Sequence, residues 1–480
     1  MYLRATNIST QTQDVYGFGF ESAGALGFTN EYSGLAAESA QLYCFRRIQV
    51  RMPDIAGFVF WRRHMKTRID NLYTAYIGID WANSKHDICL HSIDGKPREF
   101  YKISHQVEKI EEWAKSLRKR FGGKIAVALE LSKGPIVYAL QKYDFLVLFP
   151  VNPTTLAKYR EAFNPSGAKD DPTDAELILD LVLRYPNRFH PLKPQSVELR
   201  KLALLVEQRR KLVNDKIRVT NRLRDTLKQY YPQTLEWFDH IDTLLFCDFI
   251  SRWPSLKQVK RARSATVEKF FHEHNMRFNH VLQARLTSIK KAKPLTLDEA
   301  VIDSHQLHAQ HLADVLRITL NSIKHYDEVI AEVASRHPDY TLFSTLPGAG
   351  PSLAPRLLVA FGEQRERFNN ATEFQKYSGV APVTERSGKK CWVHWRWQCP
   401  TFLRQTFVEW AAQTINKSFW AGAYYRQQRE KGCTYQAALR SLAFKWIRIL
   451  YRCWETHTPY DESVYLKALQ RRGSPLLKQL

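Results

Sequence analysis

The sequence lacks the features of a membrane or secreted protein. Its 480 residues contain no apolar run near the length of about 20 residues that spans a bilayer. The N-terminus has no positively charged segment followed by an apolar one, as a secretory signal would. The seven cysteines are scattered and odd in number, which favours a reducing compartment over a disulfide framework. We therefore expect a cytoplasmic protein without a membrane partner.

Basic residues and regular periodicity are scarce at the N-terminus. Residues 1–43 contain no lysine, and Arg4 is their one basic residue. Neither a helical nor a strand period persists through them. We expect residues 1–72 to form a poorly ordered N-terminal extension. One hypothesis is that residues 1–64 are translated from an upstream start codon.

The sequence also lacks a complete zinc-finger pattern. Cys391, His394 and Cys399 lie close together, but a fourth ligand at finger spacing is missing. Packing is therefore the expected role of these side chains.

Positive charge is abundant by contrast. There are 71 basic and 48 acidic residues, which gives a net charge of +23 and an isoelectric point near 9.6. An excess of this size indicates a polyanionic partner, and nucleic acid is the commonest one. The alternative is a generally basic, well-solvated surface. At this length we expect two or three domains.

Residues 73–190 alternate strand and helix signals. Short strands are followed by a helix with apolar residues at helical spacing, and then by two apolar runs typical of buried strands. This is an α/β pattern that opens with antiparallel strands, as in a ribonuclease-H-like core. The expected strands are 76–80, 87–91, 98–104, 124–131 and 145–151, and the expected helices are 107–121 and 134–143.

Four carboxylates in this region are hard to explain by structural needs alone. Asp80 and Glu130 belong to apolar runs, where a buried charge costs several kcal/mol unless it is paired. Asp171 is a natural N-cap before Pro172, and Asp174 lies one turn further on. Taken alone, these two acids would be explained by their favourable interaction with the helix dipole at its N-terminal end. Together, the four predict a site for divalent metal, Mg²⁺ or Mn²⁺, of the two-metal kind that acts on phosphodiesters.

Residues 196–340 are predicted to form a long helical connection. Apolar residues at seven-residue spacing indicate a coiled-coil helix over 198–229, with 307–333 as an antiparallel partner. Residues 232–300 look like an inserted helical subdomain. Ten basic residues and three acids lie between Arg200 and Lys228, which favours a face that follows phosphates over a merely solvated one. The candidate nucleic-acid contacts are Arg209, Arg210, Lys211 and Arg218.

Residues 341–470 are predicted to form a mostly α C-terminal domain. Gly348 and Gly350 precede an apolar helix, as in a helix-hairpin-helix turn that brings backbone amides to a phosphate. We expect Ser387 to lie in a basic, mobile loop that exposes its hydroxyl. Taken as a lone motif, Ser-Gly would indicate an ordinary turn serine. Tryptophans 392, 395 and 397 alternate with basic residues, as on surfaces that bind nucleic acid. The basic candidates here are Lys389, Lys390, Arg396 and Arg404.

The order of these motifs resembles the DEDD transposases, bacterial insertion-sequence recombinases related to the Piv invertase. The resemblance covers about residues 73–465. It rests on Gly-Ile-Asp at 78–80, Leu-Glu at 129–130, Lys-Asp-Asp-Pro-Thr-Asp-Ala at 169–175, Leu-Pro-Gly-Ala-Gly at 346–350 and Arg-Ser-Gly at 386–388.

The resemblance implies more than the residues do. It implies a RuvC-like N-terminal domain, a coiled-coil connection and a C-terminal transposase domain. Asp80, Glu130, Asp171 and Asp174 would bind metal, and Ser387 would form a covalent link to DNA. The active site would be composite, with the acids of one subunit meeting the serine of another in a dimer or tetramer. A structured non-coding guide RNA is a further implied partner, and the protein would act at the bacterial nucleoid.

Some features depart from that family, and two other functions stay open. Residues 1–64 have no counterpart, the 232–300 insertion lengthens the connection, and the tryptophan-rich segment 391–399 replaces basic residues and glycines. One alternative is a RuvC-like junction nuclease that uses water as the nucleophile. The other is a non-catalytic nucleic-acid-binding protein such as an RNA chaperone.

Overall fold

A computed structural model describes residues 72–163, 170–276 and 278–479 of the chain. It divides the chain into two compact units, one up to Leu192 and one from Lys193 onward, and each is described here by itself. The predictions for residues 1–64 fall outside the described ranges. Within those ranges, no helix is long and apolar enough to cross a membrane.

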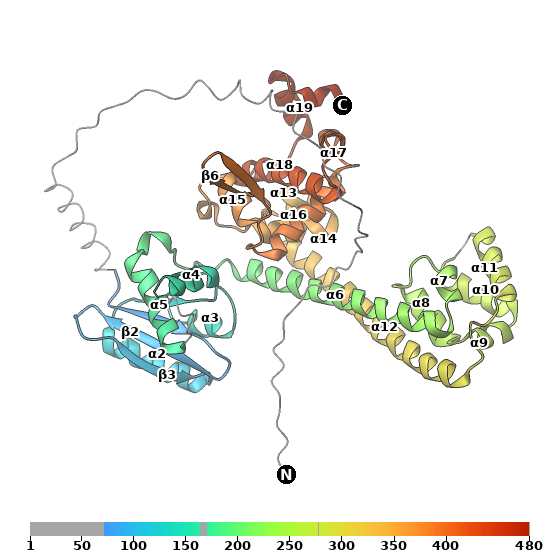
Figure 1. The fold of residues 1–480 in the computed structure, drawn as a ribbon, viewed down its shortest axis with the longest axis horizontal. Coiled ribbons are helices and arrows are strands. Elements are labelled where there is room, and N and C mark those ends of the chain that lie inside the picture. Colours follow the sequence, from blue (N-terminus) through green and yellow to red (C-terminus); the bar gives the residue numbers. More distant parts are fainter. Residues whose placement is uncertain (1–71, 164–169, 277, 480) are drawn as a thin grey trace, which may run out of the picture. The chain divides into compact units, whose positions relative to one another are not determined.

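The first unit contains a β-sheet covered by helices (Figure 1). The sheet has five strands in the order β3-β2-β1-β4-β5. The first three strands pair antiparallel, whereas β1 and β4, and β4 and β5, pair parallel. The five predicted strands are confirmed with small shifts at their ends. Their bounds are β1 Ala75–Asp80, β2 Lys85–Ser92, β3 Glu99–Ser104, β4 Ile125–Leu129 and β5 Leu146–Pro150.

Helices cover both faces of this sheet. Helices α2 (Val107–Phe121) and α3 (Pro135–Leu140) share an apolar core with Ile77, Ile79 and Val127. Helices α4 (Pro153–Phe163) and α5 (Asp171–Arg184) pack on the opposite face, against Tyr76, Ala126 and Ala128. Strand residues therefore alternate between the two faces, as a sheet buried on both sides requires. The short 3-10 helix η1 (Pro186–Arg188) follows α5.

Gly78 lets α5 approach β1 very closely. A Cβ atom at this position would lie 2.0 Å from the carbonyl oxygen of Ala175 and 2.9 Å from the amide nitrogen of Leu179. The backbone of the helix therefore lies directly on the middle of the strand. Because Asp174 precedes Ala175 and Asp80 follows Gly78 by two residues, this contact brings the start of α5 to the end of β1.

The second unit is built on two long paired helices, α6 (Val197–Tyr230) and α12 (Glu299–Ser335). The start of α6 shares a core with the end of α12, through Leu202 and Ile330. The end of α6 shares another with the start of α12, through Leu223 and Leu312. The predicted antiparallel partner is thus confirmed, although α12 begins at Glu299 rather than at 307. A coiled-coil supercoil stays a prediction.

The segment that connects the two long helices forms short helices. Between α6 and α12, five helices surround an aromatic core that includes Phe246, Phe249 and Phe271. They are α7 (Gln233–Trp237), α8 (Leu244–Arg252), α9 (Leu256–Arg261), α10 (Ser264–Glu273) and α11 (Asn279–Lys291).

The C-terminal part after α12 is mostly helical, as predicted, and also contains a two-stranded hairpin. Its core includes four fully buried tryptophans, Trp410, Trp420, Trp446 and Trp454. The helices are α13 (Tyr340–Ser344), α14 (Gly350–Phe361), η2 (Arg365–Arg367), α15 (Ala371–Tyr377), α16 (Thr401–Thr414), α17 (Phe419–Glu430), α18 (Tyr435–Glu455), α19 (Glu462–Arg471) and η3 (Pro475–Gln479).

The contact at Gly78 predicts a strong local effect of substitution. Gly78→Ala should destabilise the first unit by about 3 kcal/mol or more, because the new Cβ atom meets helix backbone that cannot move aside. Gly95→Ala is the control, since a Cβ atom there meets nothing within 4 Å and only its positive φ of 79° is unfavourable. Its cost should be about 1 kcal/mol. Hydrogen exchange of the β1 amides in the full chain measures the destabilisation caused by each variant. Equal protection of these amides in the two variants would contradict the expected difference.

Candidate active site

Asp80 and Glu130 lie at the carboxyl ends of two adjacent parallel strands. The register pairs Ile79 of β1 with Leu129 of β4, and each acid is the next residue of its chain segment. Adjacent strands of a sheet lie about 4.8 Å apart. By alternation, Asp80 lies on the same face as Gly78, and Glu130 follows Ala128 on that face, which α5 covers. Both side chains are partly buried. The predicted strand 76–80 ends at Asp80, as β1 does, whereas Glu130 was predicted inside the strand 124–131 and instead follows the last residue of β4, Leu129.

Asp174 reaches the same edge of the sheet from the first turn of α5. Its side chain is buried, with 2% exposed, and the Nε of Arg160 on α4 donates to its Oδ1 over 2.6 Å. Asp171, by contrast, is exposed. The predicted N-cap is wrong by one residue, because Asp170 takes that position and Asp171 begins the helix. Arg160 was not identified from the sequence, where nothing marks its proximity to Asp174.

The donors gathered at this edge suit a hard divalent cation. Carboxylate oxygens are the ligands that Mg²⁺ and Mn²⁺ prefer, and Asp80, Glu130 and Asp174 approach from two strands and a helix. Across the described ranges, however, no three acidic, histidine or cysteine side chains lie close enough together to hold a metal ion. In this conformation the guanidinium of Arg160 is paired with the carboxylate of Asp174. A metal bound by all four acids would have to replace that guanidinium.

A buried histidine fixes the segment that follows Asp80. His86 is fully buried, and its Nδ1 accepts a hydrogen bond of 3.2 Å from the backbone amide of Ala82. Its Nε2 therefore carries the proton and donates to Nδ1 of His105 over 2.9 Å. Burial, with the charge of His105 second, lowers the pKa of His86 to about 4. His86 is thus neutral near pH 7 and holds the chain beside Asp80 in place.

Ser387 lies at the tip of an exposed β-hairpin formed by β6 (Val383–Ser387) and β7 (Lys390–His394). Gly388 and Lys389 form the connecting turn, and Gly388 has a φ of +56°. A positive φ at the first of two turn residues is typical of a type II′ turn. The predicted loop is therefore wrong, because Ser387 is the last residue of a strand, and its mobility stays a prediction. The Ser-Gly step between runs with Val, Thr and Trp could have indicated a hairpin.

The predicted nucleic-acid contacts of this region separate into two groups. Lys389 and Lys390 are exposed at the hairpin tip. Arg396 instead donates from Nε to the backbone oxygen of Ala381 over 3.0 Å, and Arg404 donates to the backbone oxygen of Arg396 over 3.0 Å. These two arginines hold the base of the hairpin in place.

Two of the four basic residues predicted on α6 are also used within the fold. Arg209 binds Asp327 of α12 through two hydrogen bonds, one of 2.9 Å between Nη2 and Oδ2. Arg210 lies 3.3 Å from Glu409 of α16. Arg218 is exposed and pairs with Asp215 on its own helix, while Lys211 is exposed. Arg209 and Arg210 therefore stabilise helix packing, which the charge pattern alone could not show.

The turn before α14 packs against α16. Gly348 has a φ of +71°, and a Cβ atom there would lie 2.7 Å from the backbone oxygen of Gln413. The indole Nε1 of Trp410 donates to the backbone oxygen of Pro347 over 3.0 Å. Gly350 is exposed, and a Cβ atom there would meet nothing within 4 Å. Gly348 is thus explained by packing, and a phosphate contact at Gly350 stays a prediction.

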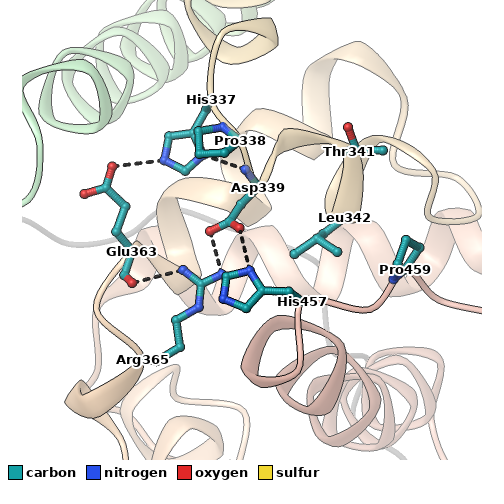
Figure 2. Close-up of a pocket in the computed structure, with 9 residues that line it drawn as sticks. All are labelled: His337, Pro338, Asp339, Thr341, Leu342, Glu363, Arg365, His457 and Pro459. Atoms are coloured by element: carbon teal, nitrogen blue, oxygen red, sulfur yellow. Dashed lines mark hydrogen bonds and ion pairs between the residues drawn. The ribbon is translucent and has the colours of Figure 1, made fainter.

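A cavity of about 490 Å³ lies elsewhere in the second unit, and charged side chains contribute to its lining. Figure 2 shows His337, Asp339, Glu363, Arg365 and His457 around it. Their side chains are bonded to one another. Nε2 of His337 lies 3.0 Å from Glu363, and Arg365 lies 2.6 Å from Asp339. None of the predicted catalytic residues lines this cavity.

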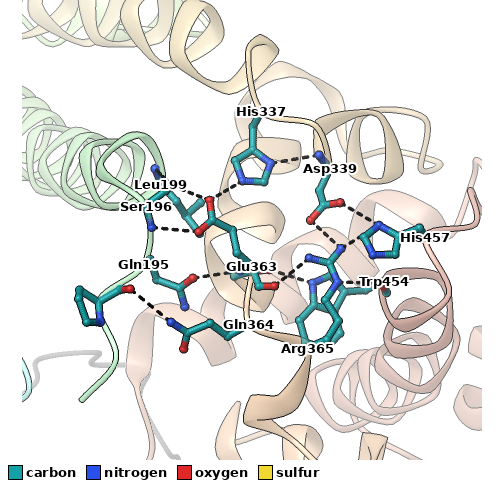
Figure 3. A network of polar contacts seen from close by, with 12 residues as sticks. Gln195, Ser196, Leu199, His337, Asp339, Glu363, Gln364, Arg365, Trp454 and His457 are labelled. Atoms are coloured by element: carbon teal, nitrogen blue, oxygen red, sulfur yellow. Dashed lines mark hydrogen bonds and ion pairs between the residues drawn. The ribbon is translucent and has the colours of Figure 1, made fainter. Parts of the chain in front are cut away.

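The same network connects to the beginning of α6 (Figure 3). Glu363 accepts hydrogen bonds from the hydroxyl of Ser196, over 2.5 Å, and from its amide, over 2.9 Å. Ser196 in turn caps α6 by accepting from the amide of Leu199. Burial raises the pKa of Glu363, but the bonds from Ser196 and His337 outweigh it and leave the pKa below its ordinary value. The network therefore anchors the start of α6 to the C-terminal core.

The chain matches known transposases along most of its length. Residues 77–232 match the DEDD transposase family of IS110 type, and residues 340–426 match the family described as transposase IS116/IS110/IS902. The mini-circle putative transposase for IS117 of Streptomyces coelicolor is 29% identical, over 84% of this chain and 98% of its own length.

Two further relatives extend this comparison. The putative transposase y4uE of Sinorhizobium fredii is 31% identical, over 42% of this chain and 57% of its own length. The insertion element IS116 uncharacterized 44.8 kDa protein of Streptomyces clavuligerus is 22% identical, over 81% of this chain and 95% of its own length. The matched regions include the segments that carry the four acids and Ser387.

The pairing of Arg160 with Asp174 predicts a large loss of stability when the arginine is removed. Arg160→Met should destabilise the first unit by about 3–5 kcal/mol, because it leaves a buried carboxylate without its cation. The double variant with Asp174→Asn should recover most of this loss. Arg184→Met is the control, since Arg184 is 59% exposed and its pairing with Asp180 should contribute at most about 1 kcal/mol.

Unfolding with and without Mn²⁺ measures these effects. Mn²⁺ should stabilise Arg160→Met more than the unsubstituted chain, because Arg160 no longer competes for Asp174. A smaller metal effect in the variant would contradict the competition.

The lowered pKa of Glu363 predicts a pH-dependent contribution to stability. Its stabilisation should be complete above the ordinary value of 4.5 and decline as the pH falls through the lower folded pKa. Glu363→Gln should therefore cost about 1–3 kcal/mol at pH 7 and less below pH 4.5. Glu366→Gln is the control, because Glu366 is 64% exposed. Urea unfolding at several pH values tests this, and a constant difference would refute it.

Proposed function

The chain belongs to the transposase family of the insertion sequences IS110, IS116 and IS902, and from this premise we propose how it cuts and joins DNA. Ser387 is the nucleophile, and Asp80, Glu130, Asp171 and Asp174 form a metal-binding tetrad. The observation that carries the proposal is the placement of Ser387 at the exposed tip of a hairpin, between Arg386 and the adjacent Lys389 and Lys390. An exposed hydroxyl beside basic residues is accessible to DNA, and the basic residues attract the phosphate backbone.

The proposed reaction is a transesterification at phosphorus. The Oγ of Ser387 attacks a DNA phosphodiester, a new phosphorus–oxygen bond forms, and the bond to the deoxyribose oxygen breaks. The serine proton is lost and the leaving oxygen gains one, so the charge of the phosphodiester is unchanged. Attack by a hydroxyl of a second DNA strand on the phosphoserine then joins that strand and restores the serine. No oxidant, reductant or nucleotide cofactor is needed.

The four acids supply the other half of the proposed site. A divalent metal bound there would stabilise negative charge that develops on the reacting oxygens. In the first unit, the close contact at Gly78 brings Asp174 toward Asp80 and Glu130, which supports a shared role. His86 is a positioning residue in this proposal, because it holds the segment after Asp80.

Partners follow from charge and from the family. With a net charge of +23, the chain is suited to bind DNA at the ends of a mobile element and at its target. We propose a dimer or tetramer in which the tetrad of one subunit meets Ser387 of another, and a structured non-coding RNA as a guide. Both proposals rest on the resemblance to the DEDD transposases.

Ser387→Ala should abolish the covalent protein–DNA adduct and reduce recombination by at least about 1,000-fold, because the reaction loses its attacking oxygen. The fold should persist, since Ser387 is exposed. Thr384→Ala, also exposed on β6, is the matched control and should retain activity. Asp80→Asn should lose adduct and cleavage together.

Denaturing gels with end-labelled element DNA measure the adduct. Undiminished recombination by Ser387→Ala would refute the serine as nucleophile. Cleavage that depends on the tetrad but produces no adduct would instead identify a nuclease that uses water.

A further inference from the structure

The two faces of the β6–β7 hairpin carry different side chains. Residues directly opposite each other in an antiparallel pair lie on the same face. Ser387 is opposite Lys390, Glu385 is opposite Trp392, and Val383 is opposite His394, so these six share the face of the nucleophile. The other face carries two further pairs, Arg386 with Cys391 and Thr384 with Val393.

The three tryptophans of this segment have different surroundings. Trp395 is partly buried and stacks against two guanidinium groups, that of Arg440 at 3.9 Å and that of Arg404 at 4.7 Å from its ring centre. Trp397 is 79% exposed, but it lies beyond the end of β7 and is not part of the hairpin face that carries Ser387. Trp392 is 45% exposed and lies within the strand, on the face of Ser387. Trp392 is therefore the indole that is both exposed and next to the nucleophile.

Charge on this face favours an anion beside Ser387. Glu385 is its one acidic residue, and Oε2 of Glu385 lies 3.2 Å from Nε2 of His394. His394 is on the side of Glu385 away from the tip, so the carboxylate is drawn away from Ser387. Lys390 stands directly opposite Ser387 and supplies positive charge at the tip. The face thus presents a hydroxyl, a cation and an aromatic ring in sequence.

We propose that Trp392 forms a nucleobase subsite. It stacks on an unpaired base next to the phosphodiester that Ser387 attacks, while Lys390 pairs with that phosphate. Trp392 is a diagonal neighbour of Ser387, about 7–8 Å away, a separation that long aromatic side chains can bridge. Stacking requires a base outside the double helix, so the subsite selects single-stranded or locally opened DNA. The inference rests on the proposed role of Ser387.

Salt dependence separates stacking from charge. With fluorescein-labelled oligothymidylate as the probe, Trp392→Ala should weaken binding about 10-fold at every salt concentration, because stacking releases no counterions. Lys390→Ala should instead lower the slope of log affinity against log salt by about 0.7, the value for one phosphate of a single strand. Trp392→Phe, which keeps an aromatic ring, should retain most of the affinity of the unsubstituted chain. Val393→Ala, which changes an exposed residue on the other face of the hairpin, is the matched control and should bind like the unsubstituted chain.

Photo-crosslinking locates the contact. Oligonucleotides with 5-bromodeoxyuridine should crosslink at Trp392, as mapped by mass spectrometry. Unchanged affinity of Trp392→Ala, or crosslinks at Trp397 in its place, would overturn the subsite. Ser387→Ala should keep both the affinity and the crosslink. Loss of the adduct in that variant tests the nucleophile separately, so the two proposals can fail independently.

Discussion

The close contact between β1 and α5 at Gly78 is the constraint on which the arrangement of the acids depends. A strand and a helix normally keep the distance that their side chains impose, whereas here the helix backbone lies against the strand. The end of β1 and the start of α5 thereby come to one edge of the sheet, and Asp174 comes close to the strand ends that carry Asp80 and Glu130. The missing Cβ atom of Gly78 thus brings together backbone segments that lie almost a hundred residues apart in sequence and carry Asp80 and Asp174.

Burial of one of these acids needs compensation, and Arg160 supplies it. Asp174 is 2% exposed, and a carboxylate in such surroundings is stable only with a cation or several hydrogen-bond donors. Arg160 meets that need in the described conformation. In the proposed site, a metal ion would compete with this guanidinium for Asp174.

The basic residues of the second unit divide by position. Four arginines are bound to acids or to backbone oxygens of the fold, where hydrogen bonds and ion pairs stabilise helix packing and the hairpin base: Arg209, Arg210, Arg396 and Arg404. Lys211, Lys389 and Lys390 are exposed. Arginine is favoured for the first role because its planar group forms several bonds at once. The exposed lysines, as flexible point charges, suit contacts with a phosphate backbone.

Local pattern determined much of this protein. Alternating apolar runs predicted the five strands and the 107–121 helix, seven-residue spacing predicted the antiparallel helix pair, and the ordered motifs predicted the family. These signals depend on neighbours in sequence. The hairpin at Ser387, the pairing of Arg160 with Asp174 and the internal use of Arg209 and Arg210 were decided by the tertiary structure. The partner of a charged side chain depends on which distant segment packs beside it, and no local spacing records that.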